Sequence, residues 1–260
     1  NCSVIIHNTI FNSSHTSNIT GGAIYAARDI GGKIDYNNGE IQQLDIQYCC
    51  FQNCYGLKDN SGISPLYGIA IFSSAINNIL YYASTVNCPG ENGIKATGAQ
   101  FDLQGTNLSS KFVNSTGGYS DYCGGIEYRH AKDGFFRFQT ISDMKCMFSV
   151  SYTDISSKKI ELSLSNIFNV TIERGQLIND ERVYSGLIHI RKTHEIEIIN
   201  FSFIDNILED TKFQHNGQTY TDFAKIISRG TNNNGLQHID ITLIDCYYSC
   251  QNDKLINSSN

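Results

Sequence analysis

The sequence predicts an all-β solenoid in which one chain winds into stacked coils, that is, a parallel β-helix. Two observations predict this fold: an Asn or Asp recurs where short strands end, and a glycine pair opens the strand that follows. The stretch 11–25, FNSSHTSNITGGAIY, shows both features, and the stretch 112–128, FVNSTGGYSDYCGGIEY, repeats them. Self-similarity along a chain is the signature of repeat architectures, in which each unit packs on its neighbours.

The recurrent polar residue forms a ladder of expected corners along the chain. The ladder comprises Asn12, Asn53, Asn87, Asn114, Asp143, Asn169, Asp205 and Ser249. Its shortest step runs from residue 143 to residue 169, and longer steps fit coils of one minimum circumference with loops inserted at a fixed corner. Asn suits such a corner because it tolerates left-handed backbone and can bond to the same residue in the next coil. We therefore expect about eight coils with variable loop insertions.

Short runs with alternating apolar and polar residues lie between the ladder positions and predict strands. These runs are 41–48, 101–103, 136–138, 160–164, 196–203 and 239–243, and a second set after the loops covers 21–25, 67–72, 123–128, 185–190 and 223–227. Each coil should thus carry at least two strands. A β-sandwich is the main alternative fold, but it would give a more even strand spacing without an Asn register.

Length and charge limit the possible classes of protein. A repeat architecture would occupy residues 1–260 as one domain, either a segment of a longer chain or a stacking subunit. The net charge is −6 and no cluster of Lys and Arg occurs, which argues against nucleic acid as a partner. No apolar run has the length needed to span a bilayer. The chain starts without Met or a signal-peptide pattern, so we expect a mature or excised chain.

Sequons and cysteines indicate an extracellular location in a eukaryote. The Asn-X-Ser/Thr acceptors are Asn1, Asn12, Asn18, Asn107, Asn114, Asn169, Asn200 and Asn257. Sequons carry glycans only in a secretory pathway. Nine cysteines occur without zinc-type spacing, which favours a disulfide-forming compartment. An intracellular protein with buried free thiols is the alternative.

The cysteines allow more than one disulfide pattern. Cys54 and Cys88 follow ladder residues in adjacent coils, where neighbouring strands bring Cα atoms within disulfide range. Cys123 and Cys146 open strands in successive coils and could pair in the same way. Bridges across a tight corner, Cys50 with Cys54 and Cys246 with Cys250, are a second option. The connectivity stays open at this point.

No catalytic or metal-binding signature stands out, and we expect no cofactor. The richest acidic set is Asp205, Asp210, Glu195, Glu197, Asp240 and Asp245, with Arg191 and Lys192 nearby. Polysaccharide-cleaving sites need converging carboxylates, but these acids also suit a solvated sheet face. The histidines lack a metal-type spacing, although His189 and His194 could approach a carboxylate. Outward tyrosines could contact sugar rings.

The paired FxN and GGAI signals resemble the repeats of bacterial polymorphic outer-membrane proteins and related protist surface proteins. The matches are residues 11–25 and 112–128, with looser matches at 51–72 and from Phe203 to Ile226. The resemblance implies a right-handed, single-stranded parallel β-helix at a cell surface with adhesion or coat roles, and it implies no catalytic residues. Later coils depart from the pattern, because they carry one Gly or none.

The sequence therefore favours a non-catalytic structural or adhesive segment of an extracellular, N-glycosylated, disulfide-bonded surface protein. Its expected partners are copies of itself or flanking coils of the same chain, joined end to end into fibres, and cell-surface glycans. A polysaccharide lyase or glycoside hydrolase is the first alternative, by analogy of fold. A carbohydrate-binding module is the second.

Overall fold

The computed structural model describes residues 2–17, 22–27, 29–30, 33–34, 41–57, 69–88, 98–130, 133–153, 159–174, 185–191, 195–229 and 240–251. These ranges contain strands and no helix, so none of the residues described belongs to a helix able to cross a membrane.

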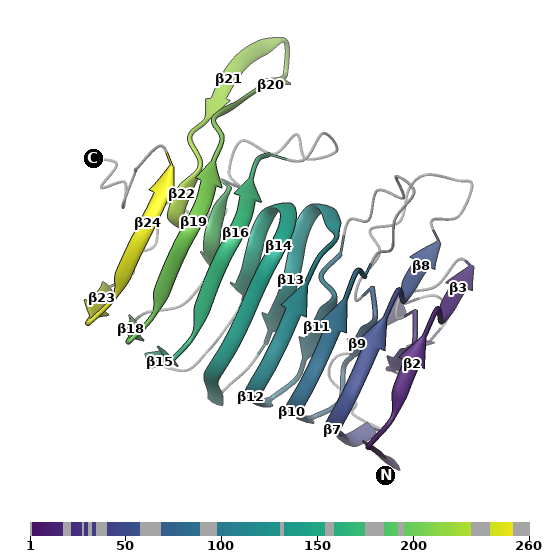
Figure 1. Cartoon of the computed structure of the whole chain (residues 1–260). Coiled ribbons are helices and arrows are strands. Elements are labelled where there is room, and N and C mark those ends of the chain that lie inside the picture. The colour runs from purple at the N-terminus through teal and green to yellow at the C-terminus, as the bar shows by residue number, and fades with distance from the viewer. Residues whose placement is uncertain are drawn as a thin grey trace.

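Most of the strands join one extended sheet whose pairings are parallel. The strands are β1 (Cys2–His7), β2 (Ile10–Asn12), β3 (His15–Ser17), β4 (Ile24–Ala26), β5 (Asp29–Ile30), β6 (Lys33–Ile34), β7 (Ile41–Gln52), β8 (Tyr55–Leu57), β9 (Ile71–Ser73), β10 (Asn77–Val86), β11 (Phe101–Gln104), β12 (Asn107–Thr116), β13 (Tyr119–Arg129), β14 (Asp133–Thr153), β15 (Lys159–Ser163), β16 (Asn166–Ile172), β17 (Gly186–Arg191), β18 (Glu195–Ile199), β19 (Ser202–Leu208), β20 (Thr211–His215), β21 (Gln218–Asp222), β22 (Lys225–Arg229), β23 (Asp240–Ile244) and β24 (Tyr247–Gln251). Figure 1 shows this sheet wrapping around an axis, with the strands following one another in sequence order along it.

The sheet has three faces around the axis. Face 1 comprises β1, β15, β18, β23 and the first halves of β7, β10, β12 and β14. Face 2 comprises β2, β16, β19, β24 and the following parts of the same long strands. Face 3 comprises β4, β9, β11, β17, β22 and the ends of β13 and β14. The predicted all-β solenoid architecture is thus confirmed.

Two rows of residues with positive φ turn the chain between faces. Corner A, between faces 1 and 2, consists of Asn8, Tyr48, Tyr82, Phe112, Phe138, Leu164, Asn200 and Asp245. Corner B, at the end of face 2, consists of Ser13, Asn53, Asn87, Gly117, Asp143, Asn169 and Asp205. Long strands run through both corners, so β14 crosses all three faces without interruption.

Corner B is the ladder that the sequence predicts, with three corrections. Asn12 pairs with Gln52, so Ser13 is the residue that occupies the corner. Asn114 pairs with Ser84 in the middle of a strand, and Gly117 takes the corner in that coil. Ser249 lacks positive φ, because the register between β19 and β24 shifts at this point. The FxN motif identifies the wrong corner residue in these coils, because its polar residue does not always coincide with the turn.

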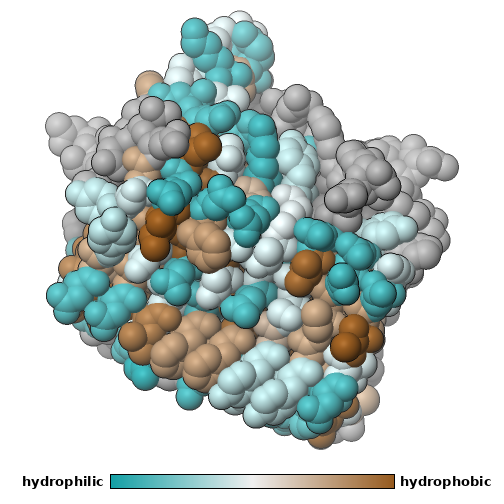
Figure 2. Space-filling view, in the orientation of Figure 1, coloured by the Kyte–Doolittle hydropathy of each residue, from teal (hydrophilic) through white to brown (hydrophobic). Residues whose placement is uncertain are grey.

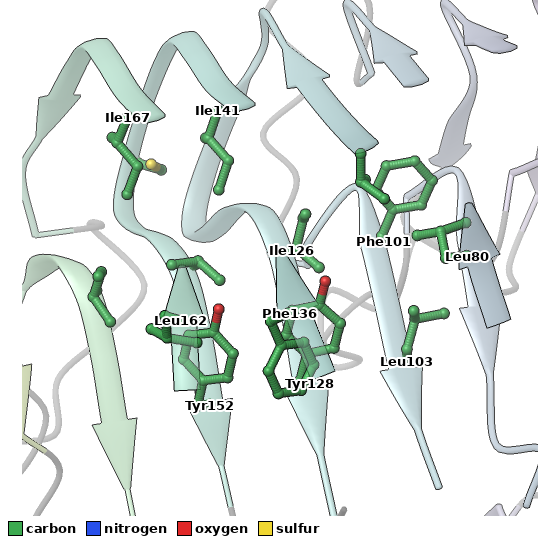
Figure 3. Close-up of a cluster of buried hydrophobic side chains, with 14 of the residues drawn as sticks. Leu80, Phe101, Leu103, Ile126, Tyr128, Phe136, Ile141, Tyr152, Leu162 and Ile167 are labelled. Carbon is green, nitrogen blue, oxygen red and sulfur yellow. The ribbon is translucent and has the colours of Figure 1, made fainter. Parts of the chain in front are cut away.

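The interior of the solenoid is filled by inward rows of aliphatic and aromatic side chains. Figure 3 shows Tyr128 and Tyr152 from face 3 beside Phe136 from face 1. The Tyr128 ring centroid lies 4.3 Å from that of Phe136 and 5.3 Å from that of Tyr152. Buried tyrosine hydroxyls need partners, and Tyr128 donates to Ser110 Oγ at 2.7 Å. Gln139 Nε2 donates to the Tyr128 hydroxyl at 2.6 Å, so Tyr128, Ser110 and Gln139 satisfy one another.

The glycine pair of the repeat has a packing cause. A Cβ on Gly22 would lie 2.6 Å from the Ile69 carbonyl oxygen, and one on Gly125 would lie 2.5 Å from that of Ser149. Both oxygens belong to the backbone of the next coil, which cannot move aside. The second glycine of GG is therefore required by the close approach of successive coils.

An antiparallel hairpin, β20 and β21, leaves the solenoid between β19 and β22 and projects from it (Figure 1). Its turn is Asn216-Gly217, with φ of 49° and 76°, the geometry that a two-residue hairpin turn favours. At its base the buried Arg174 Nη1 lies 3.3 Å from Asp222 Oδ2. The Arg174 guanidinium also lies 3.7 Å from the centre of the Phe213 ring, so it holds the hairpin to the segment that follows β16.

Candidate functional site

Corner A carries bulky side chains on backbone that usually disfavours them. Tyr48, Tyr82, Phe112, Phe138 and Leu164 have φ between 52° and 55°. For a bulky residue this conformation costs about 1–2 kcal/mol relative to right-handed backbone. Five successive coils bear this cost at the same corner, which makes corner A the most unusual surface feature among the described residues.

The four aromatic rings of corner A stack face to face along the axis. Ring centroids are 4.8 Å apart for Tyr48 and Tyr82, 4.6 Å for Tyr82 and Phe112, and 4.5 Å for Phe112 and Phe138. These distances match the spacing of parallel strands. Because each ring face is covered by the next ring, the solvent meets ring edges. The exposed fractions are 56%, 47%, 37% and 37% in chain order. Figure 2 shows a row of side chains along the lower edge of the molecule, whose colour changes from brown and tan at one end to pale teal at the other.

A groove runs beside corner A on face 2. The groove has a volume of about 440 Å³. One of its walls is made by Tyr82, Phe112, Phe138 and Leu164. Its floor holds Ser84, Asn114, Thr140 and Asn166, which lie opposite one another on successive strands. The lining contains hydroxyls, amides and apolar edges but no charged side chain. Such a groove suits a neutral ligand that has both polar and apolar surfaces.

A second unusual feature is a pair of acids buried on face 3. Asp102 and Glu127 lie opposite one another on β11 and β13 and are 0% and 1% exposed. The Arg129 Nη2 atom lies 2.5 Å from Glu127 Oε2 and 3.5 Å from Asp102 Oδ2. Burial raises the pKa of Asp102 to about 7; the charge of Arg129 opposes the rise and that of Glu127 adds to it.

A histidine lies further along the same row of face 3. Ser151 pairs with Glu127 on one side and with His189 on the other. His189 is buried, its Nδ1 lies 3.0 Å from Ser228 Oγ, and its ring stacks on Phe148 at 4.1 Å. Burial lowers the pKa of His189 to about 3, so the imidazole is neutral. Sequence alternation could not identify this row, because outward strand positions are usually solvated.

The acids singled out from the sequence do not converge as one set, although Glu195 lies opposite Asp240 on β18 and β23. Asp205 lies at corner B and Asp245 at corner A. Glu195, Glu197 and Asp240 belong to face 1, and Asp210 lies just before β20. Arg191 belongs to face 3, whereas Lys192 and His194 lie outside the described residues. The described part of the chain contains no group of three or more His, Cys, Asp or Glu that could hold a metal ion.

The described sequons all present their asparagine at the surface. Asn12, Asn107, Asn114, Asn169 and Asn200 are exposed. Asn1, Asn18 and Asn257 lie outside the described residues. The structure therefore places sequons on faces 1 and 2 and at both corners, and it places Asn114 in the floor of the groove.

All nine cysteines are free thiols in the structure. Only the pair Cys54 and Cys88 has the expected geometry: both follow corner B residues in adjacent coils, both are buried, and Cys54 N donates to Cys88 Sγ at 3.1 Å. This pair stays a prediction.

The other proposed pairs are out of register. Cys123 lies opposite Phe148, while Cys146 lies opposite Ser120. Cys54 is in the core, but Cys50 lies opposite Ser84 on the outward side of face 2.

No tight corner separates the last two cysteines either. Cys246 and Cys250 are separated by the extended residues of β24. Four extended residues span about 13 Å, which exceeds disulfide reach.

No protein-family profile, characterised protein or solved structure matches this chain. Two features of the structure bear on its chemistry, the groove beside corner A and the buried acid pair on face 3. The groove is open and uncharged, which suits binding. The acid pair is buried and already neutralised in part by Arg129, which suits a structural role.

Proposed function

We propose that this chain is a non-catalytic adhesive segment of an extracellular surface protein, and that the groove beside corner A binds neutral carbohydrate. The single observation that carries the proposal is the pairing of a polar floor with an aromatic wall. Sugars present hydroxyls on their edges and C–H groups on their faces, so a row such as Ser84, Asn114 and Thr140 can bond the hydroxyls. The ring edges and Leu164 supply apolar contact.

The architecture proposed with this function is a right-handed, single-stranded parallel β-helix of about eight coils, forming one domain over residues 1–260. Two corner rows and three faces support it. The link to polymorphic outer-membrane proteins rests on the repeated FxN and GG signals, and the extracellular location rests on exposed sequons. The proposal of end-to-end assembly rests on the outermost described strands, such as β2 and β24, each of which pairs with one described strand only.

The binding test is retention on immobilised neutral polysaccharides and a glycan array, with protein made in a host that adds no N-glycans. Tyr82→Ala should weaken retention, because Tyr82 lines the groove. Tyr48→Ala is the matched control: Tyr48 belongs to the same aromatic stack but lies outside the groove. Equal retention of the two variants, or no retention of the parent protein by any glycan, would refute the proposal.

A glycoside hydrolase is a second candidate, favoured by Asp102 and Glu127 on neighbouring strands. Paired carboxylates with different proton affinities perform acid and base work in such enzymes. Assays for new reducing ends on the same polysaccharides test it, with Glu127→Gln as the control. We expect no release of product, since both acids are covered. Release that Glu127→Gln abolishes would replace the binding proposal by an enzymatic one.

A further inference from the structure

The groove contains one of the chain's own glycan acceptors. Asn114 starts the sequon Asn114-Ser115-Thr116. It lies in the groove floor between Ser84 and Thr140, and it is two residues after Phe112, whose ring forms part of the wall. A sugar attached to its Nδ2 atom would therefore start inside the groove.

We propose that Asn114 carries an N-linked glycan whose first sugars lie in this groove against Phe112 and Phe138, and that glycosylation thereby closes the groove to other carbohydrate. The second half of this inference rests on the proposed function, because it assumes that the groove binds sugars supplied from outside. The first half requires only the geometry of the groove. The chain would then exist in a glycosylated, closed form and an unglycosylated, adhesive form.

The attachment step needs an oligosaccharide joined to a lipid pyrophosphate as donor, as the secretory pathway supplies. The Nδ2 atom of Asn114 forms a bond to C1 of the first sugar, and the bond from C1 to the pyrophosphate oxygen breaks. The Nδ2 atom loses one proton and the lipid pyrophosphate leaves. The resulting amide is neutral, so it adds no charge to an uncharged groove.

Hydrogen bonding separates Asn114 from two other described sequons. Asn107 Nδ2 donates to Asn77 Oδ1 at 2.6 Å, and Asn169 Nδ2 donates to Asp143 Oδ1 at 2.6 Å. Neither of these asparagines lines the groove. The Asn114 amide has no such side-chain partner among the described residues, so a glycan there displaces no bond of the fold. Its first sugars would cover ring edges that are now exposed to solvent.

The groove has room for this occupant. Its volume of about 440 Å³ lies within the range of about 300–1,000 Å³ that holds small ligands. The wall is apolar and the floor is polar, which matches the two kinds of surface on a sugar ring. Glycans at corner B, such as one on Asn169, would instead extend from a turn into solvent. The glycan on Asn114 should therefore be the less accessible of the two.

The test compares the full chain from a glycosylating eukaryotic host with two variants. Thr116→Val removes the groove sequon and leaves Asn114 in place, and Thr171→Ala removes the sequon at Asn169 as the matched control. Glycopeptide mass spectrometry gives occupancy. Release by a glycosidase from the folded protein should be about tenfold slower at Asn114 than at Asn169, the ratio that 1.4 kcal/mol of protection produces. Thr116→Val should restore carbohydrate retention, and Thr171→Ala should not.

Each outcome has one meaning. Slow release at Asn114 together with restored retention supports both halves of the inference. An unoccupied Asn114, or equal release rates at the two sites after folding, overturns it. Equal retention by the occupied parent chain and by Thr116→Val overturns the closing of the groove. If no form is retained by any carbohydrate while release at Asn114 is slow, the glycan lies in the groove as proposed, but the proposed adhesive function is wrong.

Discussion

Asp102 and Glu127 lie opposite one another on neighbouring strands, both buried, and share one guanidinium, that of Arg129. Two carboxylates with one cation cannot both be ionised cheaply in the absence of water. The solenoid therefore contains a group whose protonation is coupled to folding.

We predict that Asp102 makes the protein less stable as the pH rises from about 4 to about 7. Its folded pKa is about 7, above the ordinary value of 3.8, so in this window the folded state keeps a proton that the unfolded chain has lost. The free energy of unfolding should fall by at most about 1.4 kcal/mol per pH unit from this group. In urea titrations at several pH values, Asp102→Asn should reduce the decrease of the free energy of unfolding with pH. Asp245→Asn, at an exposed corner, should leave this decrease unchanged. An unchanged slope in Asp102→Asn would contradict the prediction.

His189 should have the opposite effect below pH 6.5. Its folded pKa is about 3 because it is buried, so as the pH falls the unfolded chain takes up a proton that the folded protein does not. Stability contributed by the neutral ring is therefore present above pH 6.5 and is lost toward pH 3. His189→Gln should reduce the loss of stability in acid, measured by thermal unfolding. Ser228→Ala removes the partner of Nδ1 but keeps the histidine. This variant should lose as much stability in acid as the parent protein. A similar acid response in both variants would refute this account.

The sequence predicts the architecture better than it predicts the sites. The positions Asn53, Asn87 and Asp143 have the left-handed backbone that was expected of the ladder, because an Asx residue at a turn is a local signal. Corner A carries this signal in its outer coils, at Asn8, Asn200 and Asp245, but not in its middle coils. There Tyr82 and Phe112 resemble strand residues, and the register of the stacked coils places them at positive φ.

The buried acids show a second limit of sequence reasoning. The alternation in FDLQ and IEYR predicts outward acids in solvent, yet Asp102 and Glu127 are covered. Whether an outward strand position is buried depends on what packs over the sheet, which a local pattern does not contain. The hairpin turn Asn216-Gly217 is different, since the Asn-Gly pair between alternating strands is a local signal that could have predicted it.

The glycine pair of the repeat provides a test of how closely the coils pack. Gly125→Ala would bring Cβ to 2.5 Å from a backbone oxygen of Ser149, whereas Gly124→Ala meets side-chain atoms of Cys146 and Met144 at 2.8 Å. Backbone cannot move without disturbing the sheet, so Gly125→Ala should cost about 1–3 kcal/mol. Gly124→Ala should cost less, because the Met144 and Cys146 sulfur atoms can rotate aside and only the Cys146 Cβ atom, also at 2.8 Å, must shift with its backbone. Urea unfolding of the two variants measures this, and an equal or smaller cost for Gly125→Ala would contradict the close approach.

Cys54 and Cys88 should form a disulfide when the protein is exposed to an oxidised thiol such as glutathione disulfide. They occupy the same inward row in adjacent coils, and a hydrogen bond from the Cys88 thiol, the largest cause, lowers the pKa of Cys54 to about 7. A thiolate near neutral pH is the species that attacks a disulfide. The two thiols would each lose one hydrogen, and the oxidant would be reduced to two thiols.

Alkylation of the unfolded, unreduced protein tests this pairing. Seven of the nine cysteines should be modified in the oxidised protein (9 − 2), and eight in Cys88→Ala, in which Cys54 has lost its partner (9 − 1). The bridge would close a loop between positions 34 residues apart and should raise the free energy of unfolding by about 3–4 kcal/mol. Modification of all nine cysteines after oxidation would show that the register brings these residues together without bonding them. A bridge between Cys123 and Cys146 instead would contradict the pairing of β13 with β14.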